Sequence, residues 1–355
     1  MTMAKRSKDE RAPMALYRTY RPANFVEVLG QEHITKVLEA AVKQKKVAHA
    51  YLFAGGRGTG KTSMARILAH ALGTHDEDVY EIDAASNRQV DDARALREGV
   101  STLPFSSTYK FYILDEVHMF TKDAFNTLLK TLEEPPEHAI FVLATTELEK
   151  VPDTVQSRCQ IFHFKKPSHE VLKTLALDIA KKEGTKLAPA GAELIAMMGD
   201  GSFRDTLGIL QKVLTISSDA TLTEDEVAAV VGAPPSKLVS AFLQALADKE
   251  IASAVDAFHT ALKQGAEPRV FVLVAAARVR AVLLARFAPK MEKELESQFG
   301  ADDMVLVKKL AGAAGAAVNS NVLAELLTAL IETPRAPLPA LPLELALYRL
   351  FGSKE

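Results

Sequence analysis

The sequence predicts an α/β domain built on a parallel sheet with helices at its sides, followed by a small and then a larger helical segment. Between Ala50 and Phe164, short apolar runs alternate with longer stretches of helical periodicity. Each run has four or five mostly apolar residues, as expected for strands buried on both faces of a parallel sheet. After Pro167 the strand-like runs stop, and the chain reads as helical almost to its end.

The expected strands and helices follow one another in regular order. One helix is expected at Thr121–Glu134, because apolar residues recur there three and four positions apart and a pair of prolines follows. Alternation of this kind is typical of βαβ units. The five expected strands are Tyr51–Ala54, Val79–Ile82, Phe111–Leu114, Ile140–Ala144 and Ile161–Phe164.

Changes of pattern along the chain predict three domains after a leader. Residues 1–15 are charged and lack an apolar core, so we expect a flexible leader and not a secretory signal. Residues 16–166 hold all the expected strands, residues 167–230 form a small helical domain, and residues 231–355 form a larger one. Gly199-Asp200-Gly201 separates two helices of the small domain, and the segment TPRAPLPALP at 333–342 interrupts the last domain.

The composition indicates a globular protein of the cytoplasm. Of the 355 residues, 48% are hydrophobic and 25% are charged, and no apolar run approaches the ~20 residues of a membrane span. Cys159 is the single cysteine, which excludes an intramolecular disulfide and a multi-cysteine zinc site. The net charge of −2 gives no sign of a globally basic protein, so any contact with DNA must come from a local basic face or from several subunits together.

A glycine-rich segment fits the phosphate-binding pattern G-x-x-x-x-G-K-[ST]. It follows an expected strand and opens an expected helix, which is the context that supports this reading. Backbone N–H groups and the helix N-terminus would surround the phosphates of ATP, Lys61 would reach the β- and γ-phosphates, and Thr62 would bind Mg²⁺. The segment consists of Gly55, Gly56, Arg57, Gly58, Thr59, Gly60, Lys61 and Thr62, and Ser63 follows it.

Two acidic residues follow the expected strand Phe111–Leu114. Asp115 is placed to hold Mg²⁺, usually through water. Glu116 is the candidate base that orients and polarises the attacking water. An acidic pair alone is commonly a solvated loop, but its position beside a phosphate-binding segment favours the catalytic interpretation.

Four further segments resemble AAA+ ATPases of the clamp loader, and two of them, EIDAAS and the opening YRP segment, resemble the gamma/tau subunits of bacterial DNA polymerase III in particular. The resemblance extends from about residue 16 to residue 215, and the helical remainder is compatible in size with the collar domain of that family. It implies an AAA+ core at 16–166, a lid domain at 167–230 and a collar domain for oligomerisation at 231–355. The segments are YRP at 20–22 with its continuation to Gln31, EIDAAS at 81–86, LKTLEEPP at 129–136 and SRC at 157–159.

The resemblance implies roles for three residues outside the phosphate segment. Thr146 matches the sensor of the γ-phosphate or the water, although Thr145 remains an alternative. Arg204 matches the second sensor, unless it simply pairs with Asp205. Arg158 matches an arginine finger that acts on ATP bound by the neighbouring subunit, with an ordinary surface ion pair as the alternative. A guanidinium supplied in trans is worth ~10³–10⁵ in rate in well-studied systems.

The resemblance also implies an adenosine pocket near the start of the chain. Tyr17 has the alternative of packing in the core. The pocket would be lined by Tyr17, Arg21, Pro22, Val28 and Leu29.

The sequence departs from this family at one place. The family usually has a cysteine-rich zinc insert after the phosphate-binding helix, whereas residues 73–78 connect directly here and contain no cysteine. We therefore predict no zinc, and a solvated loop is the better interpretation of His75 among its acidic neighbours. The long tail of the tau product is not found in this sequence, which leaves contacts with helicase and polymerase open.

A basic helix is the candidate for contact with DNA. In the family, helix N-termini and basic side chains follow the DNA backbone without reading sequence. Arg88 and Arg94 are the candidates here. The alternative is a solvated helix face on which Arg94 and Arg97 pair with nearby acidic residues.

The function that the resemblance implies is that of an ATP-hydrolysing motor subunit, which loads the sliding clamp onto primer–template DNA. Its partners would be delta, delta-prime and further gamma copies in a pentamer, and no membrane. One alternative is a stator subunit that does not hydrolyse ATP, against which the intact Lys61, Thr62, Asp115 and Glu116 argue. Another is a branch-migration helicase, which the absence of a winged-helix pattern disfavours. No intrinsic polymerase activity is expected.

Overall fold

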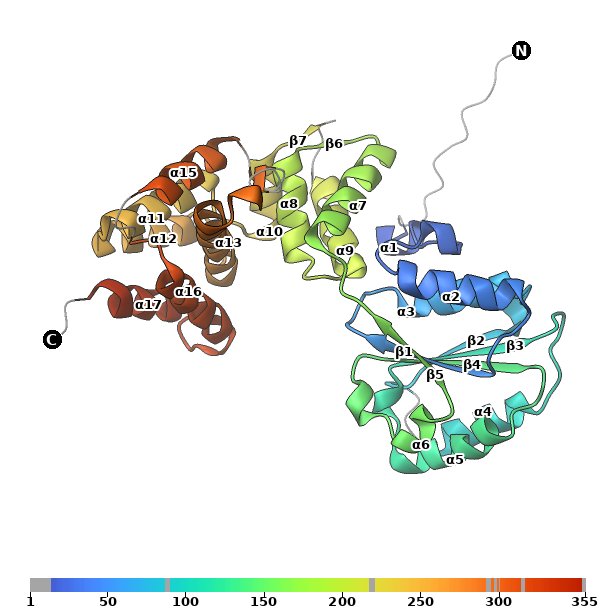
Figure 1. Ribbon diagram of the computed structural model, residues 1–355. Coiled ribbons are helices and arrows are strands. Elements are labelled where there is room, and N and C mark those ends of the chain that lie inside the picture. The colour runs from blue at the N-terminus through green and yellow to red at the C-terminus, as the bar shows by residue number, and fades with distance from the viewer. Residues whose placement is uncertain are drawn as a thin grey trace, which may run out of the picture. The chain divides into compact units, whose positions relative to one another are not determined.

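The computed structural model describes residues 14–86, 90–216, 221–291, 295–296, 299, 301–313 and 317–352 (Figure 1). Packing divides the chain into two compact units. Unit 1 contains the chain up to Leu172 together with Gly199–Gly208, and unit 2 contains Lys173–Met198 and the chain from Ile209 onward. The three-domain division at 166 and 230, and the leader before residue 16, stay predictions, and residues 1–13 lie outside the described part.

Unit 1 is built on a five-stranded parallel sheet with the order β2-β3-β4-β1-β5 (Figure 1). The predicted parallel α/β fold is confirmed, and each expected strand is found within one residue of its predicted bounds. The strands are β1 (Ala50–Gly55), β2 (Val79–Asp83), β3 (Lys110–Asp115), β4 (Ala139–Thr145) and β5 (Gln160–Phe164).

Helices cover both faces of this sheet (Figure 1). On one face, residues of α2 and α3 pack with the apolar side chains of the strands, and on the other face residues of α4 and α5 do so. The predicted helix at 121–134 is α5. The Thr121 side chain caps its N-terminus by accepting a hydrogen bond from the Ala124 N–H, one of the backbone donors that have no partner inside the helix. The helices are α1 (Leu16–Thr19), α2 (Glu32–Lys43), α3 (Lys61–Ala71), α4 (Val90–Val100), α5 (Lys122–Glu133) and α6 (Asp153–Gln156).

The expectation that all five strands are buried on both faces is wrong for β2 and β5. Tyr80 of β2 is 39% exposed, and Glu81 of β2 and Gln160 and His163 of β5 are also exposed. The cause is the strand order, because β2 and β5 lie at the two edges of the sheet and each pairs with one strand, β2 with β3 and β5 with β1.

A buried carboxylate fixes the segment that leads into β3. Asp78 accepts hydrogen bonds from the backbone N–H groups of Phe105, Ser106 and Ser107 at 2.5, 2.9 and 2.8 Å. Burial acts to raise the pKa of Asp78, but the hydrogen bonds from Ser106, Phe105 and Ser107 prevail and lower this pKa to about 2. Asp78 therefore holds the segment that carries Phe105, whose side chain is 83% exposed.

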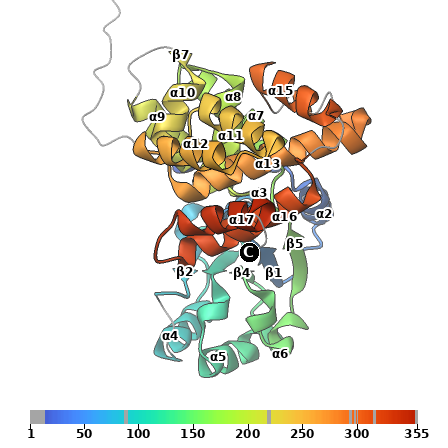
Figure 2. The same cartoon turned by 90° about the vertical axis from the view of Figure 1, so that its left-hand side faces the viewer.

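Unit 2 is almost entirely helical, as the sequence predicts. Its largest core residues include Phe242, Phe258 and Phe271, which stack edge to face at about 5 Å. The buried Arg278 pairs with Asp303 at 2.6 Å. Helices α16 and α17 lie side by side (Figure 2). The helices from this part of the chain are α7 (His169–Lys182), α8 (Pro189–Met198), α9 (Phe203–Ile216), α10 (Glu224–Val231), α11 (Ser236–Asp248), α12 (Ile251–Lys263), α13 (Pro268–Phe287), α15 (Ala301–Gly312), α16 (Ser320–Glu332) and α17 (Leu341–Phe351).

Two details of the helical region differ from or refine the expectation. Two short strands, β6 (Lys186–Leu187) and β7 (Thr221–Leu222), form a parallel pair after Pro167, so the expectation that strands stop there is wrong. The predicted break at Gly199-Asp200-Gly201 is found between α8 and α9.

No single helix in the described part of the chain is both long and apolar enough to cross a membrane. Helices α10 and α11 meet that criterion only as a pair bent by 82°. Both contribute buried side chains to the helical core, and core helices pass the same test.

Candidate nucleotide site

The phosphate-binding segment connects β1 to α3 at the carboxyl edge of the sheet. Lys61 is 5% exposed, and its Nζ donates hydrogen bonds to the carbonyl oxygens of Gly55 at 2.8 Å and Gly56 at 2.9 Å. Burial lowers the pKa of Lys61, while the Glu116 and Asp115 carboxylates act in the opposite direction. The ammonium therefore lies inside the loop, held by backbone carbonyls, where phosphate oxygens could replace its acceptors.

Two glycines of the loop adopt left-handed backbone conformations that side chains disfavour. Gly58 has φ +70°, and a Cβ there would lie 1.9 Å from Ser202 Oγ. Gly60 has φ +99° and precedes the first residue of α3. The Phe203 N–H donates to the Gly58 carbonyl at 3.0 Å. The start of α9 thus packs directly on the phosphate loop.

The hydroxyl and carboxylate expected to hold Mg²⁺ are in contact. Thr62 Oγ1 donates to Asp115 Oδ2 at 2.7 Å, which joins the start of α3 to the end of β3. Magnesium prefers such oxygen ligands and keeps several of its waters. Thr62 and Asp115 fit a magnesium ion for this reason.

Glu116 lies beside this pair, in a left-handed backbone conformation with φ +49°. Its N–H donates to Asp115 Oδ1 at 3.0 Å, and its carboxylate accepts a hydrogen bond from Thr146 Oγ1 at 3.0 Å. Thr145 differs from Thr146, since its Oγ1 lies 3.1 Å from His118 Nδ1. The structure thus brings the predicted base and the predicted sensor together, while the sensor role itself stays a prediction.

His118 belongs to this site, although the sequence reasoning did not select it. Its side chain is 8% exposed, and Nδ1 lies 3.4 Å from Glu116 Oε2. On the other side of the ring, Nε2 lies 3.4 Å from Glu147 Oε1. The available signal was its place two residues after the acidic pair.

Residues predicted to bind adenosine lie near an arginine cluster. The Arg204 guanidinium lies 5.0 Å from the centre of the Tyr17 ring, at the distance of a cation–π contact. Hydrogen bonding and charge from Arg18, followed by Arg204, lower the pKa of Tyr17. Burial lowers the pKa of Arg21, and Arg66 and Arg204 are among the neighbouring charges that add to this.

Other residues of the predicted pocket differ in burial. Tyr17, Pro22 and Val28 are half-buried, and Val28 packs against the core of the sheet. Leu29 is 41% exposed. The preceding Leu16 is the buried member of α1, so Tyr17 is not a fully buried core residue.

Arg158 follows α6 and precedes β5. Its guanidinium pairs with Glu133 of α5 and donates to the Thr154 carbonyl at 2.5 Å. The side chain is 32% exposed. Within one chain it therefore makes the surface ion pair of the alternative interpretation, and the finger role stays a prediction.

The predicted DNA contacts are only partly described. Arg88 lies outside the described residues. Arg94 is exposed on α4. Neither the contact with DNA nor the solvated-face alternative is tested by this geometry.

The fold is similar to that of solved AAA+ motors. The chain superposes with a TM-score of 0.52 on the Thermotoga maritima RuvB Holliday junction branch migration motor, at 24% identity over 64% of this chain and 79% of that chain. At this identity the likeness shows the fold alone. Fold and loop together define an α/β P-loop core of the AAA+ class.

Sequence comparisons narrow this class further. Residues 30–89 and 73–168 match the family model of the DNA polymerase III delta subunit, and residues 222–355 match that of DNA polymerase III subunits gamma and tau domain III. The tau subunit of Bacillus subtilis is 42% identical over 79% of this chain and 54% of its own length. The tau subunit of Escherichia coli is 37% identical over 75% of this chain and 42% of its own length.

In the region that it shares with them, the chain belongs to the family of DNA polymerase III gamma/tau subunits. It spans about half the length of the curated relatives that it matches, such as 52% of the gamma/tau subunit of Mycobacterium tuberculosis. The predicted resemblance is confirmed.

Proposed function

We propose that this chain is an ATP-hydrolysing motor subunit of a clamp loader, which uses ATP to place the sliding clamp on primed DNA. The observation that carries the proposal is the convergence of Lys61, the Thr62–Asp115 pair and Glu116 at the carboxyl edge of the sheet. Open α/β sheets bind their ligands at this edge. A chain of the gamma/tau family in which the lysine, the hydroxyl and both carboxylates are in place has the groups that phosphoryl transfer requires.

Each group has a definite role in the proposed reaction. Lys61 would exchange its carbonyl acceptors for phosphate oxygens, and Thr62 and Asp115 would hold the metal. Bound magnesium supplies charge that neutralises the phosphates. Glu116 would accept a hydrogen bond from the attacking water and orient it, while Thr146 holds the carboxylate.

The position of the start of α9 would depend on which nucleotide is bound, and this would couple the site to the rest of the chain. Phe203 bonds to the P-loop carbonyl of Gly58, and Arg204 follows on the same helix. A phosphate that attracts the Arg204 guanidinium would draw this helix end toward the site. Because α9 continues beyond unit 1, this pull offers a route from nucleotide to domain movement.

Arg158 is proposed to complete the site of a neighbouring subunit. An exposed ion pair such as Arg158–Glu133 contributes ~0–1 kcal/mol, so exchanging Glu133 for a phosphate costs little. Hydrolysis would then require contact between subunits, so that only the assembled complex would hydrolyse ATP at the full rate.

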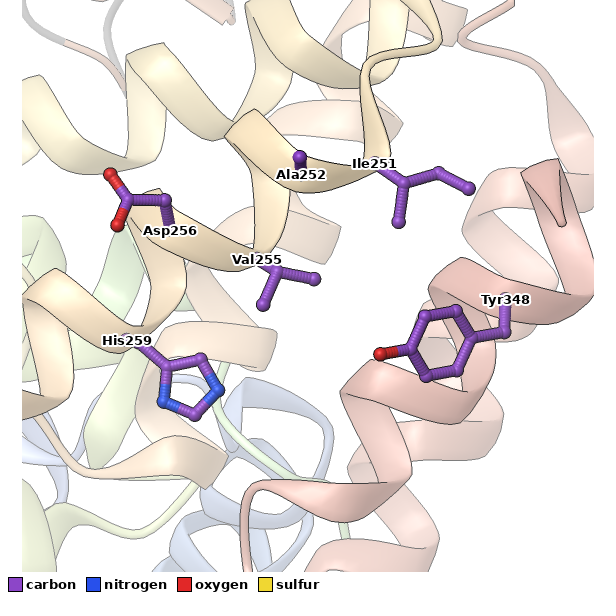
Figure 3. Close-up of a pocket in the computed structure, with 6 residues that line it drawn as sticks. All are labelled: Ile251, Ala252, Val255, Asp256, His259 and Tyr348. Atoms are coloured by element: carbon purple, nitrogen blue, oxygen red, sulfur yellow. The ribbon is translucent and has the colours of Figure 1, made fainter.

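Assembly with delta-type subunits and further copies of this chain would use the helical unit. Helices α16 and α17 expose Leu327, Ile331, Leu345 and Tyr348. Of these residues, Tyr348 points across an open groove toward α12 (Figure 3). Exposed apolar surface of this kind commonly marks a protein interface. The groove is lined by Ile251, Ala252, Val255, Asp256, His259 and Tyr348.

The remaining parts of the proposal are a pentameric complex in the cytoplasm, no zinc, and backbone contacts to primer–template DNA through Arg88 and Arg94. Loss of salt-sensitive DNA binding in an Arg88→Ala/Arg94→Ala complex would support the DNA contacts, and unchanged binding would defeat them. A stator subunit without hydrolysis uses the same fold, but the intact Lys61, Thr62, Asp115 and Glu116 would have no role in it.

The test is ATPase activity of the reconstituted complex with clamp and primed DNA. Lys61→Ala should abolish nucleotide binding and hydrolysis, whereas Glu116→Gln should keep binding and lose hydrolysis. Lys45→Ala, at an exposed lysine of the same unit, is the matched control. Full activity in the Lys61→Ala complex would point to the stator and overturn the proposal.

A further inference from the structure

Besides Thr146, the proposed base lies near His118, which connects it through Glu147 and Lys150 to the segment after β4. His118 lies between Glu116 and Glu147, with Nδ1 3.4 Å from Glu116 Oε2 and Nε2 3.4 Å from Glu147 Oε1. Glu147 is itself held by Lys150, whose Nζ lies 2.7 Å from Glu147 Oε2. Carboxylate, imidazole, carboxylate and ammonium therefore form one continuous chain that ends at the catalytic position.

This series of contacts is suited to holding the carboxylate of a catalytic base in one orientation. Where a catalytic group must keep one orientation, a neighbouring side chain holds it and is held in turn by a third group. The ring nitrogens of histidine are distinct, and each one here lies 3.4 Å from a carboxylate oxygen on its own side. Thr145 Oγ1 lies 3.1 Å from Nδ1 and accepts a hydrogen bond from the Glu147 N–H, so it ties the same ring to the same segment.

Burial makes this contact more than a surface pairing. The His118 side chain is 8% exposed, while Glu116 and Glu147 are 30% and 38% exposed. A contact shielded from water on the ring side is stronger than one in bulk solvent. The backbone of Glu116 is also in a left-handed conformation with φ +49°, which residues other than glycine rarely adopt.

We infer that His118 is a positioning residue for hydrolysis, which holds the Glu116 carboxylate through Nδ1 and is itself held by Glu147. This rests on the proposed function, since it presumes that Glu116 orients the water. Loss of His118 leaves ATP binding intact, because the polar partners of its ring are Thr145, Glu116 and Glu147, and not the P-loop groups that would hold phosphate. It lowers the rate of hydrolysis, because Glu116 samples orientations that do not face the water.

The link also reaches the segment that carries the proposed finger. Glu147 begins the stretch that contains the 3₁₀ turn Leu148–Lys150 and helix α6, and Arg158 follows α6. Gln156 ties this stretch together by donating to the Val151 carbonyl at 2.8 Å. The base of one site and the finger offered to the next site are thus joined within a single chain.

Two substitutions at His118 separate positioning from simple packing. In His118→Asn the amide nitrogen lies near the place of Nδ1 and keeps a donor for Glu116, whereas His118→Leu fills similar space without a donor. In the reconstituted complex with clamp and primed DNA, we expect His118→Leu to lower kcat about tenfold or more. His118→Asn should stay within about threefold of wild type, and the Kd of a non-hydrolysable ATP analogue should be unchanged in both.

A third variant tests the outer carboxylate with a matched control. Glu147→Gln should lower kcat about threefold in the wild-type background and have no further effect in His118→Asn, because the amide lacks the second ring nitrogen. Glu149→Gln, at an exposed neighbour, should leave kcat unchanged. Glu147 is 38% exposed, so its variant should fold even where His118→Leu does not.

The outcomes are decisive in both directions. Equal kcat for wild type and His118→Leu, equal loss in His118→Leu and His118→Asn, or a Glu147→Gln complex identical to wild type would each overturn the inference. The Glu116→Gln complex separates this from failure of the proposed function. If Glu116→Gln abolishes hydrolysis while the His118 variants do not, the inference alone fails; if Glu116→Gln hydrolyses ATP normally, the proposed function fails.

Discussion

The contact between the phosphate loop and the start of α9 gives a prediction whose size follows from the structure. In Gly58→Ala, the new Cβ would lie 1.9 Å from Ser202 Oγ and 2.9 Å from Ser202 Cβ. An alanine with φ near +70° costs about 1 kcal/mol relative to glycine, and overpacking adds about 1–3 kcal/mol. Ser202 cannot turn away freely, because its Oγ accepts the Asp205 N–H at 3.1 Å near the start of α9. The expected loss is therefore about 2–4 kcal/mol of unfolding free energy.

Gly60→Ala is the matched control for the backbone contribution. Gly60 also has a positive φ, of +99°, but a Cβ there would meet nothing within 4 Å. It should lose only about 1 kcal/mol. Thermal unfolding of the nucleotide-free chain, followed by circular dichroism, should place the transition of Gly58→Ala about 4–8 °C below that of Gly60→Ala.

A second-site change tests whether Ser202 causes the difference. Ser202→Gly removes both clashing atoms, and glycine replaces a capping serine at a cost of only a few tenths of a kcal/mol. The Gly58→Ala/Ser202→Gly chain should therefore recover most of the difference from Gly60→Ala. If Gly58→Ala and Gly60→Ala unfold together, the start of α9 does not pack on the loop in solution, and the proposed route from nucleotide to α9 loses its basis.

Two further predictions concern charges elsewhere in unit 1. Asp78→Asn should lose about 2 kcal/mol of unfolding free energy at neutral pH, because the pKa of Asp78 falls from 3.8 to about 2 on folding. A lowered pKa contributes stability that is fully present above pH 3.8 and is lost as the pH falls toward about 2, so urea unfolding should show the gap to wild type narrowing only in that range. Asp76→Asn, at a side chain that is 80% exposed, is the matched control and should unfold close to wild type at neutral pH. Arg204→Ala should weaken binding of a non-hydrolysable ATP analogue about tenfold in a fluorescence titration, as loss of a charge-assisted hydrogen bond would, whereas Lys212→Ala should not; equal affinities would exclude a sensor role.

Much of the fold was readable from the sequence because buried strands leave a simple signal. Three of the five strands, β1, β3 and β4, lie inside the sheet and are almost entirely buried, so most of their residues are apolar, and their bounds were placed within one residue. The edge strand β2 carries Glu81 and an exposed Tyr80, so its burial could not be known without the strand order. The pair β6–β7 has two residues per strand, too few for any periodicity to show.

The candidate site was predictable where it follows local pattern and not where it depends on contacts distant in sequence. Lys61, Thr62 and Asp115 could be named because a phosphate loop and an acidic strand end have fixed spacing. His118 could not, because a lone histidine acquires meaning only when the fold brings Glu147 and Thr145 to its ring. The fit of Ser202 against Gly58 likewise depends on how α9 packs.

The central claim is that Arg158 of one subunit completes hydrolysis in the next, and a mixing experiment tests it directly. Complexes built only from Arg158→Ala chains, or only from Glu116→Gln chains, should bind ATP and lose stimulation by clamp and primed DNA, with a loss of up to ~10³-fold or more. When the two variants are mixed before assembly, some neighbours combine an intact Glu116 with an intact Arg158, and stimulated ATPase activity should return. A mixture as inactive as its two parents, or an Arg158→Ala complex as active as wild type, would contradict the account.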